Sequence, residues 1–204
     1  MRKIEFINVN FAYENSNIYI NDLNFEFQCG FSYMIRGNNG SGKTTLVDIM
    51  SKMLKDYTGY IMFDGKELHT ISKQEICNIM GICFQQTPIF RDTLINNIIF
   101  DRPKDMEKLH SLDFFGILDE FEDRMNTLIN DTSISGGQAQ KIGILRTLYL
   151  DKEVYVFDEP TANLDIFSCE KFWDNINRIK KDKIIIVISH DLNTDKYVDG
   201  VIKL

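Results

Sequence analysis

The sequence feature that most constrains the fold is an eight-residue run early in the chain, Gly37-Asn38-Asn39-Gly40-Ser41-Gly42-Lys43-Thr44. It matches the pattern Gly-x-x-x-x-Gly-Lys-Ser/Thr, and it lies between an apolar run at 31–35 and a helical pattern at 43–54. Glycines at these positions let the backbone curl until successive N–H groups point at a phosphate beside a helix N-terminus. The run therefore predicts a strand, a phosphate-binding loop and a helix, in that order.

Two side chains of this loop carry the expected chemistry. The ammonium of Lys43 supplies a point charge to the β- and γ-phosphates of a nucleoside triphosphate, and the hydroxyl of Thr44 is expected to ligate Mg²⁺. We expect every residue from Gly37 through Thr45 to contribute to nucleotide binding.

The composition is that of a soluble globular chain. With 204 residues, 44% of them apolar and 26% charged, the chain is long enough for one domain with its own core. The net charge of -7 argues against a nucleic-acid-binding surface, which usually carries a basic excess. The four cysteines show neither metal-ligand nor redox-pair spacing, and we expect them to be reduced and packed: Cys29, Cys77, Cys83 and Cys169.

No apolar run approaches the ~20 residues that are needed to span a bilayer. Any connection to a membrane is therefore expected to come through a partner or through a longer parent polypeptide. Because the chain begins at the first strand and stops at Leu204, at what resembles a last strand, it is expected to be a compact subunit or a domain cut from a larger protein.

Further apolar runs indicate the rest of a central sheet. They are typical of buried strands, and a turn that carries a motif follows each of them: 81–84, 154–157 and 184–188. Together with 31–35 they predict an open parallel sheet, in which ligands gather at the carboxyl ends of the strands. Segments with stricter alternation predict an antiparallel edge or side sheet: 4–9, 25–27 and 60–63.

Helical patterns fill most of the remainder: 43–54, 106–115, 137–150 and 169–179. Residues 88–134 contain helical and irregular segments without a strong strand, so we expect an inserted helical lobe there. The predicted fold is α/β, with a mainly parallel core sheet and an antiparallel β subdomain. One domain, 1–204, is expected to consist of a catalytic core, 1–87 and 135–204, and this lobe.

Two adjacent carboxylates follow the apolar run 154–157. Asp158 is expected to hold the hydration shell of Mg²⁺, and Glu159 is placed to polarise an attacking water as a general base. The alternative is a solvated Asp-Glu pair at the end of a strand. The matched phosphate loop earlier in the chain favours the catalytic interpretation, since the two sets of residues have mutually consistent roles.

The most specific motif is Ser135-Gly136-Gly137-Gln138, which precedes a helical pattern and so places amides at a positive helix end suited to phosphate. With the phosphate loop and the carboxylate pair, it resembles the signature of the ATP-binding cassette (ABC) family. The resemblance runs over nearly the whole chain. It implies a P-loop NTPase of ABC type that binds ATP and Mg²⁺ and couples ATP hydrolysis to transport.

The resemblance also assigns single residues to the nucleotide. Tyr13 falls where the family has an aromatic ring that stacks on adenine, Gln85 where a glutamine reaches Mg²⁺ and the attacking water, and His190 on the switch histidine that contacts the γ-phosphate. Each has an alternative from the residues alone. The alternatives are a packed core aromatic for Tyr13, a strand cap for Gln85 or Gln86, and an ordinary turn histidine for His190.

A second cassette is implied as a partner. The tetrapeptide at 135–138 matches the segment that binds the γ-phosphate held by an opposite subunit, and the loop 161–165, which ends in Asp165, matches the loop that crosses the dimer interface. If Lys43 and the tetrapeptide lie on separate lobes, one chain cannot place both on the same phosphate. Two chains that face each other head to tail satisfy both, so we expect an ATP sandwich with two sites.

The segment 85–98 is similar to the exporter branch of the family. Its apolar residues are expected to line either a groove for a short helix of a transmembrane domain or the core of the lobe itself: Ile89, Phe90, Leu94, Ile95 and Ile98. Two features depart from the exporter pattern. Ile134 replaces the usual leucine before the signature, and 127–133 lacks the Gly-Glu-x-Gly segment of exporters.

The expected function is an ATP-hydrolysing motor domain of an ABC transporter. Its partners would be a second nucleotide-binding domain and a transmembrane domain, in the same or a separate polypeptide, which would hold the chain at the cytoplasmic side of the cell membrane. The alternative is a soluble ABC ATPase that acts on DNA or ribosomes. The chain lacks the long coiled coil and the paired cassettes of those classes, and no nucleic acid is expected as a partner. A degenerate cassette is disfavoured because Lys43, Asp158, Glu159 and His190 are all present.

Overall fold

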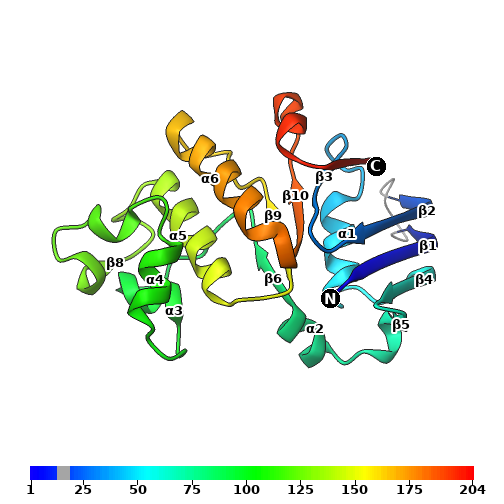
Figure 1. Ribbon diagram of the computed structural model, residues 1–204, viewed down its shortest axis with the longest axis horizontal. Coiled ribbons are helices and arrows are strands. Elements are labelled where there is room, and N and C mark those ends of the chain that lie inside the picture. Colours follow the sequence, from blue (N-terminus) through cyan, green and yellow to red (C-terminus); the bar gives the residue numbers. More distant parts are fainter. Residues whose placement is uncertain (13–18) are drawn as a thin grey trace.

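The computed structural model describes residues 1–12 and 19–204, so Tyr13 lies outside the described residues. Figure 1 shows a central parallel sheet with an antiparallel sheet on one side and a lobe of short helices on the other. This arrangement confirms the predicted α/β class. Within the described residues, no helix is long and apolar enough to cross a membrane.

The central sheet has the strand order β11-β3-β10-β9-β6, and every pair in it is parallel. Its strands are β3 (Ser32–Arg36), β6 (Met80–Cys83), β9 (Val154–Asp158), β10 (Ile184–Ile188) and β11 (Gly200–Lys203). All residues of β10 are buried, as expected for a strand that is covered on both faces. The four apolar runs in the sequence are confirmed as strands. Their carboxyl ends lie at one edge, where the motif-bearing turns begin.

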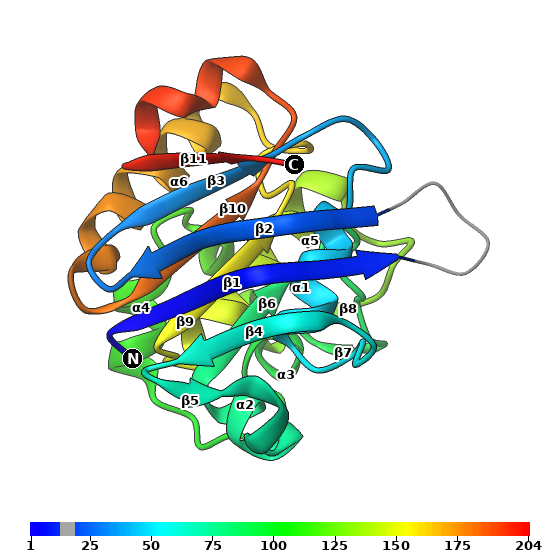
Figure 2. The same cartoon turned by 90° about the vertical axis from the view of Figure 1, so that its right-hand side faces the viewer.

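The second sheet is antiparallel and has the order β2-β1-β4-β5 (Figure 2). Its strands are β1 (Lys3–Ala12), β2 (Tyr19–Gln28), β4 (Thr58–Phe63) and β5 (Lys66–Glu67). Helix α1 (Lys43–Met50) packs between the two sheets, where Leu46, Ile49 and Met50 join a core that draws side chains from both. The predicted helix 43–54 is too long, because Lys52 adopts a left-handed φ of 59° after the cap at Ser51.

The helical lobe has its own core. It contains α3 (Leu94–Ile99), α4 (Met106–Leu112) and the 3-10 turns η2 (Ile117–Asp119) and η3 (Arg124–Asn126), beside a small sheet of β7 (Asp92–Thr93) and β8 (Leu128–Ile129). Four of the five residues expected either in a docking groove or in the lobe core are core residues: Ile89, Leu94, Ile95 and Ile98. Phe90, the fifth, is 48% exposed.

Helix α5 (Gly136–Tyr149) joins the lobe to the central sheet, because Ile142 and Leu145 lie in the lobe core while Ile144 and Leu148 pack with strand residues. Helix α6 (Ile166–Ile179) covers the same face of the sheet through Phe172 and Trp173, among others. It begins three residues earlier than the predicted helix 169–179.

The remaining elements are short connections: η1 (Leu68–Thr70), α2 (Lys73–Ile79), η4 (Lys180–Asp182) and η5 (Leu192–Tyr197). Helix α2 was not expected from its hydrophobic pattern, since Ile76 is its only buried residue. A capping box between Ser72 and Glu75 starts it, and this local hydrogen bonding stabilises a helix without an apolar face.

Candidate nucleotide-binding and catalytic site

The phosphate loop connects β3 to α1, and its glycines are required by its shape. Gly42 has a left-handed φ of 95° directly before the helix. A Cβ on Gly37 would lie 2.2 Å from the Oγ of Ser41 and 2.7 Å from the backbone oxygen of Leu204. No side chain caps α1, and its first turn holds no acidic residue, so the first amides and the positive end of the helix remain available to an anion.

Lys43 points back over this loop. Its Nζ donates to the backbone oxygens of Gly37, at 2.8 Å, and Asn38, at 2.9 Å. Both acceptors are neutral carbonyls, which do not cancel the charge of the ammonium. The positive charge is therefore held at the mouth of the loop, where it can act on a phosphate.

A cavity of about 460 Å³ brings most of the expected residues together. It is lined by Asn39, Gly40, Gly42, Lys43, Thr44, Thr45, Gln85, Asp158, Glu159, Ile188 and His190. These residues come from the phosphate loop and the start of α1, from the ends of β9 and β10, and from the turns after β6, β9 and β10. The cavity thus lies at the carboxyl edge of the parallel sheet, where such folds bind ligands.

Asp158 is a partly buried carboxylate in a negative environment. Burial raises its pKa, the neighbouring charges of Glu159 and Asp48 raise it further, and the ammonium of Lys43 opposes them. A cation that binds here would relieve both the desolvation and the repulsion. The sequence patterns did not point to Asp48 as a residue near the site. It lies four residues after Thr44 and therefore on the same face of α1, which is a signal that could have found it.

The oxygen donors at this point fit a magnesium ion. The hydroxyl of Thr44, the side-chain amide of Gln85 and the carboxylate of Asp158 are hard oxygen ligands, and all three residues line the cavity. Among the described residues, no cluster of three His, Cys, Asp or Glu side chains could hold a metal alone. Magnesium is suited to such a sparse site, since it usually keeps water and substrate phosphates as ligands.

Glu159 and His190 are in direct polar contact in the cavity. The Oε1 of Glu159 lies 2.7 Å from the Nδ1 of His190 and accepts a 3.2 Å hydrogen bond from the backbone N–H of His190. Glu159 is buried and has a left-handed φ of 47°, which is uncommon for a residue with a side chain. Its backbone N–H donates to the oxygen of Ile188 at 2.9 Å, so the unusual conformation is fixed from β10.

The tetrapeptide 135–138 begins helix α5. The Oγ of Ser135 accepts from the N–H of Gln138 at 3.1 Å, and the Oε1 of Gln138 accepts from the N–H of Ser135 at 3.0 Å. A Cβ on Gly137 would lie 2.8 Å from the backbone oxygen of Asn163, so glycine is needed for this close approach. The tetrapeptide and the loop 161–165 therefore pack directly against each other.

Asp165 is the N-cap of helix α6. Its carboxylate accepts from the backbone N–H of Ser168 at 2.9 Å and from the hydroxyl of Ser168 at 2.8 Å. Both hydrogen bonds lower the pKa of Asp165, and the bond from the backbone N–H has the larger effect. The cap explains why α6 starts earlier than the hydrophobic pattern suggested. Neither Asp165 nor any residue of 135–138 is among the described residues that line the phosphate-loop cavity.

Comparison with known proteins decides the family. Residues 20–162 match the family model described as "ABC transporter", which is more than half of the chain. The chain belongs to the ABC transporter family.

Relatives of this ABC chain share its full length but extend well beyond it. It is 29% identical over 210 residues to an ATP-dependent lipid A-core flippase of Coxiella burnetii, covering 98% of this chain and 36% of the relative. It is 30% identical over 207 residues to the alpha-hemolysin translocation ATP-binding protein HlyB of Escherichia coli O157:H7, and this match covers 98% of this chain and 29% of the relative. The chain thus spans about a third of the length of these relatives.

A solved structure supports the fold. The bacterial Atm1-family ABC exporter with ATP bound superimposes with a TM-score of 0.91, at 24% identity, over 100% of this chain and 37% of that chain. This agreement confirms the ABC fold, and with it the parallel core and the antiparallel sheet.

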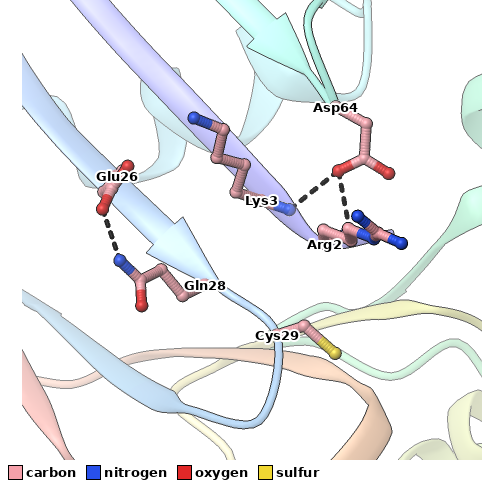
Figure 3. Close-up of a pocket in the computed structure, with 6 residues that line it drawn as sticks. All are labelled: Arg2, Lys3, Glu26, Gln28, Cys29 and Asp64. Carbon is pink, nitrogen blue, oxygen red and sulfur yellow. Dashed lines mark hydrogen bonds between the residues drawn. The ribbon is translucent and has the colours of Figure 1, made fainter.

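A larger hollow of about 740 Å³ lies elsewhere on the ABC domain, where β1 begins and β2 ends (Figure 3). Its lining residues are Arg2, Lys3, Glu26, Gln28, Cys29 and Asp64. The Oδ1 of Asp64 already accepts from the backbone N–H groups of Arg2, at 2.7 Å, and Lys3, at 2.8 Å. Since it is open and contains none of the ABC motifs, its volume does not mark it as the nucleotide site.

Proposed function

We propose that this chain is the ATP-binding and ATP-hydrolysing motor domain of an ABC transporter of the exporter type. The observation that carries the proposal is the cavity itself, in which a phosphate loop faces Asp158, Glu159 and His190. One relative named above is a flippase, another is a translocation ATP-binding protein, and the superimposed structure is an ABC exporter. These names support the exporter branch and do not favour an ATPase that acts on DNA or ribosomes.

Binding would use the positive elements of the cavity. The open amides at the start of α1 and the ammonium of Lys43 would hold the β- and γ-phosphates. Thr44, Gln85 and Asp158 would hold Mg²⁺, which when bound neutralises charge that develops on the phosphates. Tyr13 remains a proposed adenine contact on the strength of its place in the sequence.

Hydrolysis would depend on Glu159. Its Oε1 is engaged by His190 through both the ring and the backbone, so the second carboxylate oxygen is left to polarise a water for in-line attack on the γ-phosphate. Glu159 would accept the proton of that water, and His190 would steady the carboxylate and contact the γ-phosphate. Fixing the base before the reaction is how a site gains rate without reorganisation at the moment of attack.

A second cassette would complete the site. Ser135, Gly136, Gly137 and Gln138 are outside the phosphate-loop cavity of their own chain, so they would serve the nucleotide of a facing chain. The backbone N–H groups of Ser135 and Gln138 are engaged in the capping box, and those of Gly136 and Gly137 would contact its phosphates. Ile166 and Phe167, directly after Asp165, are 76% and 77% exposed. Apolar side chains this exposed support a partner at that end of α6.

A transmembrane domain would contact the lobe. Phe90 and Phe100 are 48% and 44% exposed, and their rings meet edge to face with centroids 5.5 Å apart. Arg146 lies beneath both rings, 5.8 Å from the first and 4.9 Å from the second. This aromatic pair offers a docking surface in place of the buried residues of 89–98. Docking would hold the chain at the cytoplasmic side of the membrane.

The test is release of phosphate from Mg-ATP by the purified chain, compared with Glu159→Gln. The substitution keeps the shape of the side chain and removes its basic oxygen, so ATP binding should persist while hydrolysis falls by at least ~100-fold. Equal rates for the two proteins would exclude Glu159 as the base. No hydrolysis by the unsubstituted chain would exclude the proposed activity of the isolated domain.

A further inference from the structure

Arg36 occupies a position that the proposed mechanism does not use. It is the last residue of β3 and directly precedes Gly37, the first residue of the phosphate loop. Its side chain is only 11% exposed. The guanidinium makes two contacts with one carboxylate: Nη1 donates to the Oδ2 of Asp195 at 2.6 Å, and Nη2 lies 2.5 Å from its Oδ1.

The same guanidinium also holds the turn that carries His190. Nη2 of Arg36 donates to the backbone oxygen of Asp191 at 2.8 Å, and Asp191 is the residue after His190. That oxygen also accepts from the hydroxyl of Thr194, at 2.7 Å, and from its backbone N–H, at 3.4 Å. The backbone N–H of Asp191 in turn donates to the Oγ of Ser189 at 3.2 Å. Residues on both sides of His190 are therefore fixed.

This attachment begins where the sheet ends. The last paired residues of β10 and β3 are Ile188 and Ile35, followed by one long 3.4 Å hydrogen bond from the N–H of Ser189 to the oxygen of Ile35. The described strand pairing of β10 ends at Ile188, so His190 and Asp191 lie beyond it. The Arg36 guanidinium supplies the next connection back to β3, from a residue adjacent to the phosphate loop.

We propose that Arg36 and Asp195 are positioning residues for catalysis: their ion pair holds the turn 189–195 against the base of the phosphate loop, so that the His190 imidazole meets Glu159. An arginine suits this task because its planar fork contacts both oxygens of a carboxylate and keeps a donor for the Asp191 oxygen. A lysine could not maintain all three contacts. This inference rests on the proposed function, in which Glu159 is the base.

The consequence for kinetics follows from the geometry. The phosphate-loop amides and Lys43 belong to a different segment, so loosening the turn should leave the affinity for ATP nearly unchanged. The orientation of His190 and Glu159 should suffer, and small misplacements of catalytic groups cost up to ~100-fold in rate. A pair that served stability alone would not separate these two quantities.

The first experiment compares Asp195→Asn with Asp151→Asn in steady-state ATP hydrolysis. Asp151 is a matched control because it forms an ion pair with Lys183 at 3.0 Å, on a surface with no role in the site. We expect Asp195→Asn to lower kcat by about 10- to 100-fold with KM within about two-fold, and Asp151→Asn to change neither. Arg36→Lys, which keeps the charge, should lower kcat by a smaller factor.

The second experiment needs no activity. The chain has three histidines, so the ¹⁵N signals of the imidazole rings can be assigned with His190→Gln. In nucleotide-free protein, Asp195→Asn should move the Nδ1 signal of His190 toward that of a free imidazole, while Asp151→Asn should leave it in place.

The proposal is overturned if Asp195→Asn and Asp151→Asn behave alike in either experiment, provided that the unsubstituted chain hydrolyses ATP. A chain without hydrolysis refutes the proposed function instead, and the imidazole signals then decide alone whether Arg36 and Asp195 position His190.

Discussion

Replacing Gly143 by alanine should place a methyl group inside the contact between α5 and the loop that follows Gln85. A Cβ at position 143 would lie 2.3 Å from the Oγ1 of Thr87, 2.9 Å from its Cγ2 and 3.1 Å from its Cβ. Forcing a methyl group into such a contact typically costs about 1–3 kcal/mol. The better helix propensity of alanine returns about 1 kcal/mol, so the net loss of unfolding free energy should be about 0–2 kcal/mol.

The effect of Gly143→Ala on the free energy of unfolding should change sign when Thr87 is shortened to alanine. In a Thr87→Ala background the oxygen and the methyl group are gone. Of the three atoms nearest to the added methyl group, the Cβ at 3.1 Å then remains, and a shift of a few tenths of an ångström relieves that contact. Gly143→Ala should then stabilise the protein by up to ~1 kcal/mol. Urea unfolding of the four proteins measures the coupling energy, which we expect to be about 1–3 kcal/mol.

The same four proteins can also be compared in ATP hydrolysis. Thr87 is two residues after Gln85, which lines the cavity, and Gly143 is on the helix that begins at the signature. Gly143→Ala should therefore lower ATP hydrolysis by displacing Gln85, and Thr87→Ala should restore part of it. If Gly143→Ala changes stability equally in both backgrounds, to within about 0.5 kcal/mol, the reasoning from this contact is refuted.

Three further outcomes are expected. Lys43→Ala should weaken ATP binding by about 10- to 100-fold in calorimetry, because a charge-assisted contact of about 1.5–3 kcal/mol is lost, and unchanged affinity would contradict the assigned loop. Asp158→Asn should raise the melting temperature of the nucleotide-free protein, since a carboxyl whose folded-state pKa is raised destabilises the fold as pH rises through that pKa, and a lower melting temperature would oppose this. Cys83, whose pKa burial raises to about 12, should resist a thiol reagent at pH 8 that modifies exposed Cys77, and equal rates for the two thiols would count against it.

The phosphate loop and the buried strands could be predicted because their signals are local. The glycines and the Gly-Lys-Thr ending of residues 37–44 specify a phosphate-binding turn between a strand and a helix. A continuous apolar run such as 184–188 is typical of a strand that is buried on both faces of a sheet. Because Asp158 and Glu159 directly follow the buried run 154–157, their position at the carboxyl edge of the sheet could be predicted as well.

Burial in the lobe could not be predicted in the same way. An apolar residue in 89–98 suits a groove or a core equally well, and only tertiary packing showed that Ile95 is buried while Phe90 is exposed. The ion pair of Arg36 and Asp195 joins residues 159 positions apart, which no local pattern reports. The N-cap at Asp165 could have been predicted, because Asp is a favoured capping residue and Ser168 follows three residues later. The family resemblance instead led to the prediction that Asp165 lies at the dimer interface.

The central claim is that ATP is hydrolysed between two cassettes, each of which supplies a phosphate loop and a signature. Light scattering of Glu159→Gln with and without Mg-ATP tests it most directly, because this variant should bind ATP without hydrolysing it. We predict a monomer without nucleotide and twice that mass with Mg-ATP, and we predict that adding Ser135→Arg keeps the ATP-bound chain monomeric. A Glu159→Gln protein that binds ATP yet stays monomeric at high concentration would contradict the account.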